Sequence, residues 1–142
     1  MSQVFVDTSA WIALVSRDDA YHGAAAGYYR DLRGPSLVTT NAVMYETYNW
    51  LAVHRQRRAV SVLRDRIEAA QAVGLLDVVA VNADLESTAF RIFDQFDDVV
   101  LTYTDCLSAA VARAAAVEAV FTFDDDFSVL GFATVPSYRR TR

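Results

Sequence analysis

The sequence predicts an α/β fold: a three-layer α/β/α sandwich around a mainly parallel sheet of four to five strands. One observation is that short apolar runs alternate with longer segments of helical periodicity. Another is that hydroxyl and amide residues stand where the helical segments begin, as N-caps do. The chain is also 54% hydrophobic, with only two prolines and five glycines. This composition favours one globular domain over residues 1–142.

The first half of the chain is expected to supply two strands and three helices. Hydroxyl or amide residues precede two of the helical runs, and a Gly-Pro pair interrupts the chain between them. The expected elements are a strand over 3–6, a helix over 10–15 capped by Thr8 or Ser9, a helix over 18–32 ended by Gly34-Pro35, a strand over 36–39, and a helix over 42–53 capped by Thr40 or Asn41.

The second half continues the alternation, which implies parallel pairing through right-handed crossovers. Its first helix carries Val60, Leu63, Ile67 and Ala70 at helical spacing. The expected elements are a helix over 57–73 ended by Gly74, a strand over 77–81, a helix from Asn82 or Asp84 to about 96, a helix over 105–117 capped by Thr104, a strand over 120–123, and a strand over 133–135.

The charge balance argues against a protein that binds nucleic acid through overall charge, because the net charge is −5 and the pI is about 4.8. The distribution is nevertheless uneven. All 13 basic residues are arginine, and they cluster at residues 54–58, at Arg64 and Arg66, and in the tail 138–142. We regard Arg55, Arg57 and Arg58 as candidate RNA-phosphate contacts, although a solvated helix start explains them equally well.

The cysteine content and the N-terminus bear on the cellular compartment. A single cysteine, Cys106, excludes an intrachain disulfide and a cysteine-rich zinc site. The chain enters an apolar strand at once, without a basic leader, and no apolar run reaches a membrane-spanning length. We therefore expect a cytoplasmic protein without membrane contact.

Four acidic residues from separate segments are expected to meet at one edge of the sheet. Asp7 and Asp124 each follow an apolar strand directly. Glu46 lies about one turn inside the helix after the second strand, and Asp105 lies in the first turn of a later helix. In open parallel sheets, ligands bind beyond the carboxyl ends of the strands. The order of the strands decides whether all four acids converge there.

Converging carboxylates favour a divalent cation, since several of them cannot stay ionised in a semi-buried cleft without compensation. Mg²⁺ and Mn²⁺ prefer oxygen ligands, and such ions can activate water against a phosphodiester. Asp126 is a further candidate ligand, on the same side as Asp124 if the chain stays extended there, while Asp125 points to solvent. Taken singly, each acid also fits an ordinary role as a cap or a solvated residue.

Four motifs together resemble the PIN-domain nucleases, and most of all the VapC-type toxins of bacterial toxin–antitoxin pairs. They are FVDTSAW, NAVMYET, TYTDCLS and FTFDDDF, in this order along the chain. The resemblance implies RNA cleavage that depends on Mg²⁺ or Mn²⁺ and leaves a 3′-hydroxyl and a 5′-phosphate. It also implies a homodimer and a cognate VapB-type antitoxin whose C-terminal segment blocks the site. The catalytic and metal-binding residues it implies are Asp7, Glu46, Asp105 and Asp124, with supporting hydroxyls at Thr8, Ser9 and Thr122.

Three other functions are known for aspartate-rich α/β domains of this kind. A haloacid-dehalogenase-type phosphatase and a response-regulator receiver both hold a phosphoryl group with a lysine, and this chain has none. A PIN-like module that binds RNA or protein without cutting is the stronger rival. Such a module has no physical reason to gather four acids, so the nuclease reading is preferred.

Overall fold

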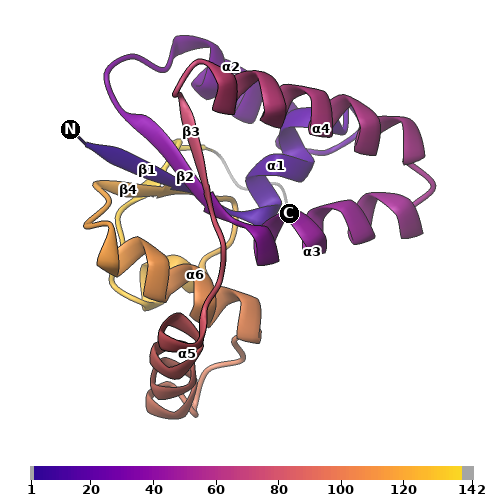
Figure 1. Cartoon of the computed structure of the whole chain (residues 1–142). Coiled ribbons are helices and arrows are strands. Elements are labelled where there is room, and N and C mark those ends of the chain that lie inside the picture. The colour runs from indigo at the N-terminus through magenta and orange to yellow at the C-terminus, as the bar shows by residue number, and fades with distance from the viewer. Residues whose placement is uncertain (1, 139–142) are drawn as a thin grey trace.

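The computed structural model describes residues 2–138 and contains the predicted parallel sheet (Figure 1). Its five strands lie in the order β3-β2-β1-β4-β5, and every neighbouring pair is parallel. The carboxyl ends of all five strands therefore point to one edge, where the acidic residues were expected. The strands are β1 (Gln3–Val6), β2 (Ser36–Thr40), β3 (Leu76–Val79), β4 (Ala119–Phe121) and β5 (Thr134–Val135).

Helices cover both faces of the sheet and complete the predicted three layers. Figure 1 shows α2 and α4 on one side of the sheet and α5 and α6 on the other, with α3 and α4 forming a hairpin that extends away from the strands. Across residues 2–138, no helix combines the length and apolar character needed to cross a bilayer. The helices are α1 (Thr8–Val15), α2 (His22–Asp31), α3 (Asn41–Val53), α4 (Arg57–Ala72), α5 (Ala83–Gln95), α6 (Tyr103–Ala114) and α7 (Asp126–Val129).

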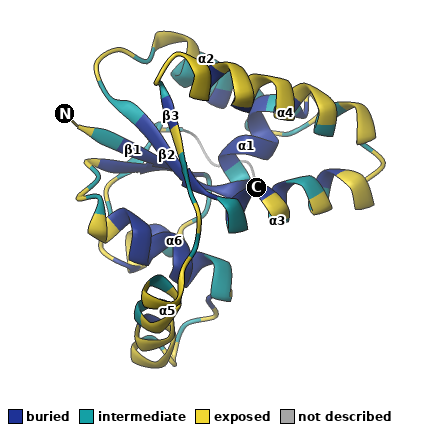
Figure 2. Ribbon diagram, in the orientation of Figure 1, coloured by how far each residue is buried: buried dark blue, intermediate teal, exposed yellow. Residues whose placement is uncertain are grey.

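The core lies between the central strands and the helices next to them. Three consecutive residues of β1, Val4, Phe5 and Val6, are buried, as a strand covered on both faces requires. Residues 105–112 of α6 are all buried, because this helix lies between the sheet and α5. Figure 2 shows the contrast between the buried α6 and the exposed outer side of α5. The start of α6, where Asp105 lies, is thus held firmly against the sheet.

Two helix caps agree with the predictions and two do not. The Thr40 side chain caps α3, and the Asn82 side chain caps α5. The prediction that Thr8 or Ser9 caps α1 was wrong, because α1 begins at Thr8 and Asp7 occupies the N-cap position without a side-chain cap bond. This difference matters for function, since it frees the carboxylate of Asp7 for other partners.

The cap predicted for α6 was also wrong. Thr102 caps this helix, not Thr104, and its hydroxyl accepts the backbone N–H of Asp105 at 3.0 Å. In return, the Asp105 Oδ2 atom accepts the backbone N–H of Thr102 at 3.1 Å. The pair is a capping box, which satisfies two otherwise unpaired backbone donors.

Other boundaries moved by a few residues. The strand expected over 120–123 ends at Phe121, and the short helix α7 that follows was not predicted. The helix expected from Asp18 begins only at His22. Gly74 was expected to end α4, and it takes a left-handed conformation (φ 75°) just after the helix, which a residue with a Cβ adopts at a cost.

Candidate metal centre

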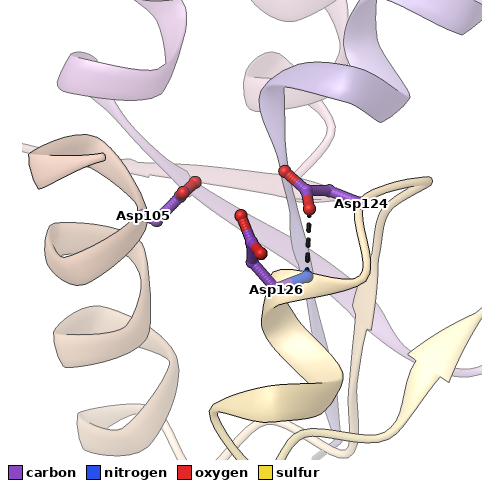
Figure 3. Close-up of side chains that lie close together, drawn as sticks. All are labelled: Asp105, Asp124 and Asp126. Carbon is purple, nitrogen blue, oxygen red and sulfur yellow. Dashed lines mark hydrogen bonds between the residues drawn. The ribbon is translucent and has the colours of Figure 1, made fainter. Parts of the chain in front are cut away.

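Three carboxylates converge at the carboxyl edge of the sheet. Asp105, Asp124 and Asp126 each offer one oxygen, and these three oxygens lie within 4.8 Å of one another. Figure 3 shows the side chain of Asp105 on α6 facing those of Asp124 and Asp126 on the segment after β4. Asp105 is buried, and the other two are half-buried. The structure thus brings together residues that are about twenty positions apart in the sequence.

A turn, not an extended strand, brings Asp124 and Asp126 to the same side. The backbone N–H of Asp126 donates to the Asp124 Oδ1 atom at 2.9 Å, and Asp126 opens α7. We expected an extended strand to place the two side chains on one side. The chain turns here instead, and the turn brings them together. Asp125 lies between them in the sequence and is exposed, as expected.

Asp7 lies beside this cluster at the end of β1 and is only 4% exposed. Its Oδ2 atom accepts two hydroxyl hydrogen bonds, from Ser9 Oγ at 2.9 Å and from Thr122 Oγ1 at 2.8 Å. The backbone N–H of Thr8 also donates to this carboxylate. A carboxylate has about four lone-pair sites, so Asp7 retains capacity for a further partner. Two of the predicted supporting hydroxyls therefore contact Asp7 directly.

The same two hydroxyls also hold the chain after β4. Ser9 Oγ accepts the backbone N–H of Phe123 at 2.9 Å, and Thr122 Oγ1 accepts the backbone N–H of Asp124 at 3.0 Å. Each hydroxyl has one hydrogen, which it donates to Asp7, so each accepts from the backbone. This network fixes Asp124 relative to Asp7.

Thr8, the third predicted supporting residue, differs from the other two. Its Oγ1 atom is buried and makes no hydrogen bond within the described part of the chain. A buried hydroxyl without a partner costs free energy, which a polar ligand at this place would recover. The position of Thr8, next to Asp7 at the start of α1, fits a group that meets a ligand or its water.

Burial and mutual repulsion make these acids hard to ionise. Burial raises the pKa of Asp7 to about 6, against the lowering effect of the hydroxyls of Thr122 and Ser9. The pKa of Asp105 rises to about 7, first through burial and then through the negative charge of Asp7. Burial and the neighbouring Asp124 also raise the pKa of Asp126. A cation among these groups would reverse the shifts.

The residues present fit Mg²⁺ or Mn²⁺. The donor set of the cluster consists of carboxylate oxygens, and hard divalent cations prefer such ligands. Asp105 gives one oxygen to its capping box and Asp7 gives one to its hydroxyl partners, so each retains acceptor capacity for a metal. The chemistry of the donors and their shared negative charge both favour a bound dication.

Glu46, the remaining predicted ligand, is not one of the three acids whose oxygens meet. It lies half-buried on α3, the helix that follows β2 just as α1 follows β1. The Thr40 cap fixes the start of α3 at the same edge of the sheet. Its role as a ligand stays a prediction.

The arginines proposed as RNA contacts lie away from the acids. Arg55 is in the turn between α3 and α4 with a left-handed backbone (φ 61°), and Arg57 and Arg58 begin α4. Figure 1 shows this turn at the far end of the hairpin. The arginines of the tail, Arg139, Arg140 and Arg142, lie outside the described residues.

An aromatic cluster next to Asp124 was missed by the sequence reasoning. The ring of Tyr21 stacks on Phe123 with 4.8 Å between centroids, and the ring of Tyr138 meets both rings edge-on. The Tyr138 hydroxyl donates to the Phe123 carbonyl oxygen at 3.2 Å. No spacing in the sequence indicates this aromatic contact. The capping box of α6 was also missed, although Thr102 and Asp105 have the spacing typical of that motif.

Comparison with known proteins agrees with this architecture. The family model of the PIN domain matches residues 4–133. A relative from Mycobacterium tuberculosis, the 23S rRNA-specific endonuclease VapC20, is 36% identical over 135 residues, which cover 93% of this chain and 97% of the relative.

Solved structures give the same result. The crystal structure of Mycobacterium tuberculosis VapC20, described as a sarcin–ricin loop cleaving toxin, matches with a TM-score of 0.80 and 33% identity over 92% of this chain and 96% of that one. A toxin–antitoxin complex from Klebsiella pneumoniae shares the fold at a TM-score of 0.67 and 16% identity, over 96% of this chain and 99% of that one. This chain belongs to the PIN domain family.

Proposed function

We propose that residues 1–142 form one nuclease domain that cuts RNA with a divalent metal ion and acts as the toxin of a type II toxin–antitoxin pair. The observation that carries this proposal is the convergence of Asp105, Asp124 and Asp126 beside Asp7 in a chain of the PIN domain family. Four acids of like charge at one partly buried edge repel one another, and a bound cation would offset this repulsion.

The protein's own residues have distinct roles in this proposal. Asp7, Asp105 and Asp124 hold Mg²⁺ or Mn²⁺, with Asp126 and Glu46 as further ligands. When bound, the ion supplies charge stabilisation and an activated water for phosphodiester hydrolysis. Ser9 and Thr122 hold Asp7 in one orientation, because both donate to the same carboxylate oxygen. The buried hydroxyl of Thr8, which has no hydrogen-bond partner among the described residues, would be available to support the bound ion.

The identity to VapC20 supports a structured ribosomal RNA as the substrate. That relative is named as specific for 23S rRNA, and its crystal structure describes a toxin that cleaves the sarcin–ricin loop. The match spans nearly the full length of both chains, which supports a shared class of substrate. We extend this target class to the present chain.

The proposal also includes partners. Solved neighbours include toxin–antitoxin complexes, and a VapB-type antitoxin with a C-terminal segment over the metal centre would keep the nuclease inactive. The toxin acts as a homodimer in the cytoplasm, where its RNA substrate is found. Both statements follow from the proposed activity and the family.

Cleavage of purified ribosomes tests the proposal. Wild type with Mg²⁺ should release fragments with a single mapped end in 23S rRNA, while Asp105→Asn, or wild type in chelator, should leave the RNA intact. Asp125→Asn is the matched control, since this exposed acid lies outside the cluster. Cleavage that persists in chelator and in Asp105→Asn would refute the metal-dependent mechanism.

A growth experiment tests the toxin role separately. Expression without an antitoxin should arrest growth, and Asp105→Asn should relieve the arrest. Equal arrest by both forms, with intact ribosomal RNA, would favour the rival reading, a PIN-like module that binds without cutting.

A further inference from the structure

A groove lined with arginines lies between α1, α2 and α4, and none of the clustered carboxylates is part of its lining. Its volume is about 680 Å³, and its charged lining consists of Arg17, Arg30, Arg58 and Arg66, with His22 beside them. Gln56 and apolar or aromatic residues, among them Tyr29, form the rest of the lining. The four arginines come from three separate stretches of the chain, so the fold, not local sequence, gathers them.

The arginines of this groove have unused hydrogen-bonding capacity. No aspartate or glutamate lines the groove, although acids outnumber bases in the chain. Within residues 2–138, Arg17, Arg58 and Arg66 make no ion pair. Arg30 pairs with its neighbour Asp31 at 3.2 Å, and both side chains are 74% exposed, so this pair is weak. The guanidinium groups are therefore available to an external anion.

His22 adds a ring nitrogen to this surface. Its Nδ1 atom lies 2.7 Å from the carbonyl oxygen of Ala13. A carbonyl oxygen only accepts, so Nδ1 is the donor, and in the neutral ring Nε2 is an acceptor. The 2′-hydroxyl of a ribose is a donor that suits such an acceptor, which is a feature that RNA has and DNA lacks.

The groove is close to the metal centre through α1. This helix begins at Thr8, next to Asp7, and its last residues, Leu14 and Val15, line the groove. Eight residues of α-helix span about 12 Å at about 1.5 Å per residue. Tyr21, which precedes His22, also stacks on Phe123 next to Asp124. A strand bound at the carboxylates reaches the groove within a few nucleotides.

A second hollow extends the positive surface. Its volume is about 540 Å³, and it is lined by Arg57 and Arg58 together with small residues of α3 and α4. Arg58 lines both hollows. A continuous basic track therefore runs from the end of α1 along α4 towards the α3–α4 turn.

We propose that this arginine groove binds the phosphodiester backbone of the RNA that flanks the cleavage point. The inference rests on the proposed nuclease function and identifies where its substrate is held. Guanidinium groups bind phosphate oxygens in pairs, and the ring of Tyr29 offers a face for a sugar or base. An acidic protein segment is the rival occupant. The groove favours RNA because it combines unpaired arginines with an acceptor for the 2′-hydroxyl.

RNA binding without cleavage tests the groove. In an Asp7→Asn background, a fluorescein-labelled single-stranded RNA of about 16 nucleotides is titrated at several salt concentrations and followed by anisotropy. The triple variant Arg17→Gln, Arg58→Gln, Arg66→Gln should bind at least about tenfold more weakly. The slope of log K against log salt should fall by about two, since each lost phosphate contact removes about 0.7.

A matched triple variant controls for the loss of charge. Arg33→Gln, Arg64→Gln, Arg91→Gln removes the same charge from exposed positions outside the groove, and it should bind RNA like the parent. Thermal melting of both triples detects any loss of folding. If the groove triple melts early, the single Arg17→Gln variant, at an exposed position after α1, should still lower the slope by about 0.7.

Each result decides the inference. Equal RNA binding by the two triple variants would overturn it. So would a groove triple that binds RNA like its parent but no longer binds a labelled poly-glutamate peptide, because that result would assign the groove to an acidic protein. Failure of the nuclease proposal looks different: wild type would leave ribosomes intact while the groove triple still lost RNA binding. If wild type cuts and the groove triple binds and cuts as well, the groove inference fails alone.

Discussion

The hydroxyl of Thr122 donates a hydrogen bond of 2.8 Å to the carboxylate of Asp7, although the two residues are 115 positions apart. The Thr122 Oγ1 atom also accepts a hydrogen bond from the backbone N–H of Asp124 at 3.0 Å. One buried threonine, 1% exposed, therefore links an acid after β1 to an acid after β4. The relationship explains how parallel neighbouring strands hold two carboxylates in register.

Replacing Thr122 by the isosteric valine should destabilise the protein and impair cleavage. The change removes a donor to Asp7 and leaves the N–H of Asp124 without its acceptor, which costs about 1–3 kcal/mol of unfolding free energy. The pKa of Asp7 should also rise further, because the Thr122 hydroxyl lowers it. Urea unfolding in chelator measures the first effect.

Thr88→Val is the control for this change. Thr88 lies on α5, where its hydroxyl accepts only an exposed bond from Arg91, so its loss should stay within about 0.5 kcal/mol. Equal destabilisation by the two valine variants would show that Thr122 has no special role at the carboxylates.

Without metal, the protein should lose stability as the pH rises from about 4 to about 7. The pKa of Asp7 is about 6 and that of Asp105 about 7, whereas both release their protons near 3.8 in the unfolded chain. Over this window the folded state binds more protons, so the unfolding free energy falls with pH and levels off above it. One pKa unit corresponds to about 1.4 kcal/mol, so a fall of a few kcal/mol is expected.

Asp7→Asn provides the comparison, because it removes one titrating group and the charge that raises the pKa of Asp105. Its stability in chelator should change less between pH 4.5 and about pH 7.5 than that of wild type. A slope as steep as that of wild type would contradict the assigned shifts. With Mn²⁺ present, stabilisation by metal should instead grow over the same window, since ligands must lose their protons.

The sequence predicted the parts of the fold that follow from periodicity. The alternation of strands and helices predicted the parallel sheet. Leu63, Ile67 and Ala70 are the buried residues of α4, as their spacing indicated. Asp7 and Asp105 were found because each stands at a strand end or helix start. These inferences depend on local patterns and on one rule of topology.

The rest depended on contacts that no local pattern encodes. The turn after β4 replaces an extended strand because Asp126 bonds back to Asp124 and Phe127 is fully buried. The arginine groove forms only when α1, α2 and α4 pack together, so Arg17 carried no signal in the sequence and Arg66 was noted only for its place in an arginine cluster. Tertiary packing decides such positions.

Divalent metal should raise the melting temperature, and Asp126 should contribute to this effect. Binding to the folded state stabilises it by mass action. Asp126→Asn should weaken the response to Mn²⁺, because its oxygen belongs to the cluster, while Asp125→Asn should keep it. Differential scanning fluorimetry with a Mn²⁺ titration measures both. If both variants lost the rise in melting temperature with Mn²⁺ equally, the net charge of the protein, and not a specific site, would explain the effect.

Glu46→Gln should lower cleavage of ribosomal RNA while leaving the fold intact. The side chain is half-buried on α3, which begins at the carboxyl edge of the sheet, and the amide keeps its shape without the charge that a cation requires. Glu86→Gln, at an exposed position on α5, is the matched control. Primer extension on treated ribosomes gives the cleaved fraction. Full activity of Glu46→Gln would remove Glu46 from the site and leave the aspartates as the ligands.

Anomalous diffraction from a crystal soaked in Mn²⁺ tests the central claim most directly. The account predicts a manganese peak at about 2.0–2.3 Å from carboxylate oxygens of the cluster formed by Asp105, Asp124 and Asp126, on the side that faces Asp7. A well-diffracting soaked crystal with no peak there, or with manganese bound only elsewhere on the surface, would contradict it.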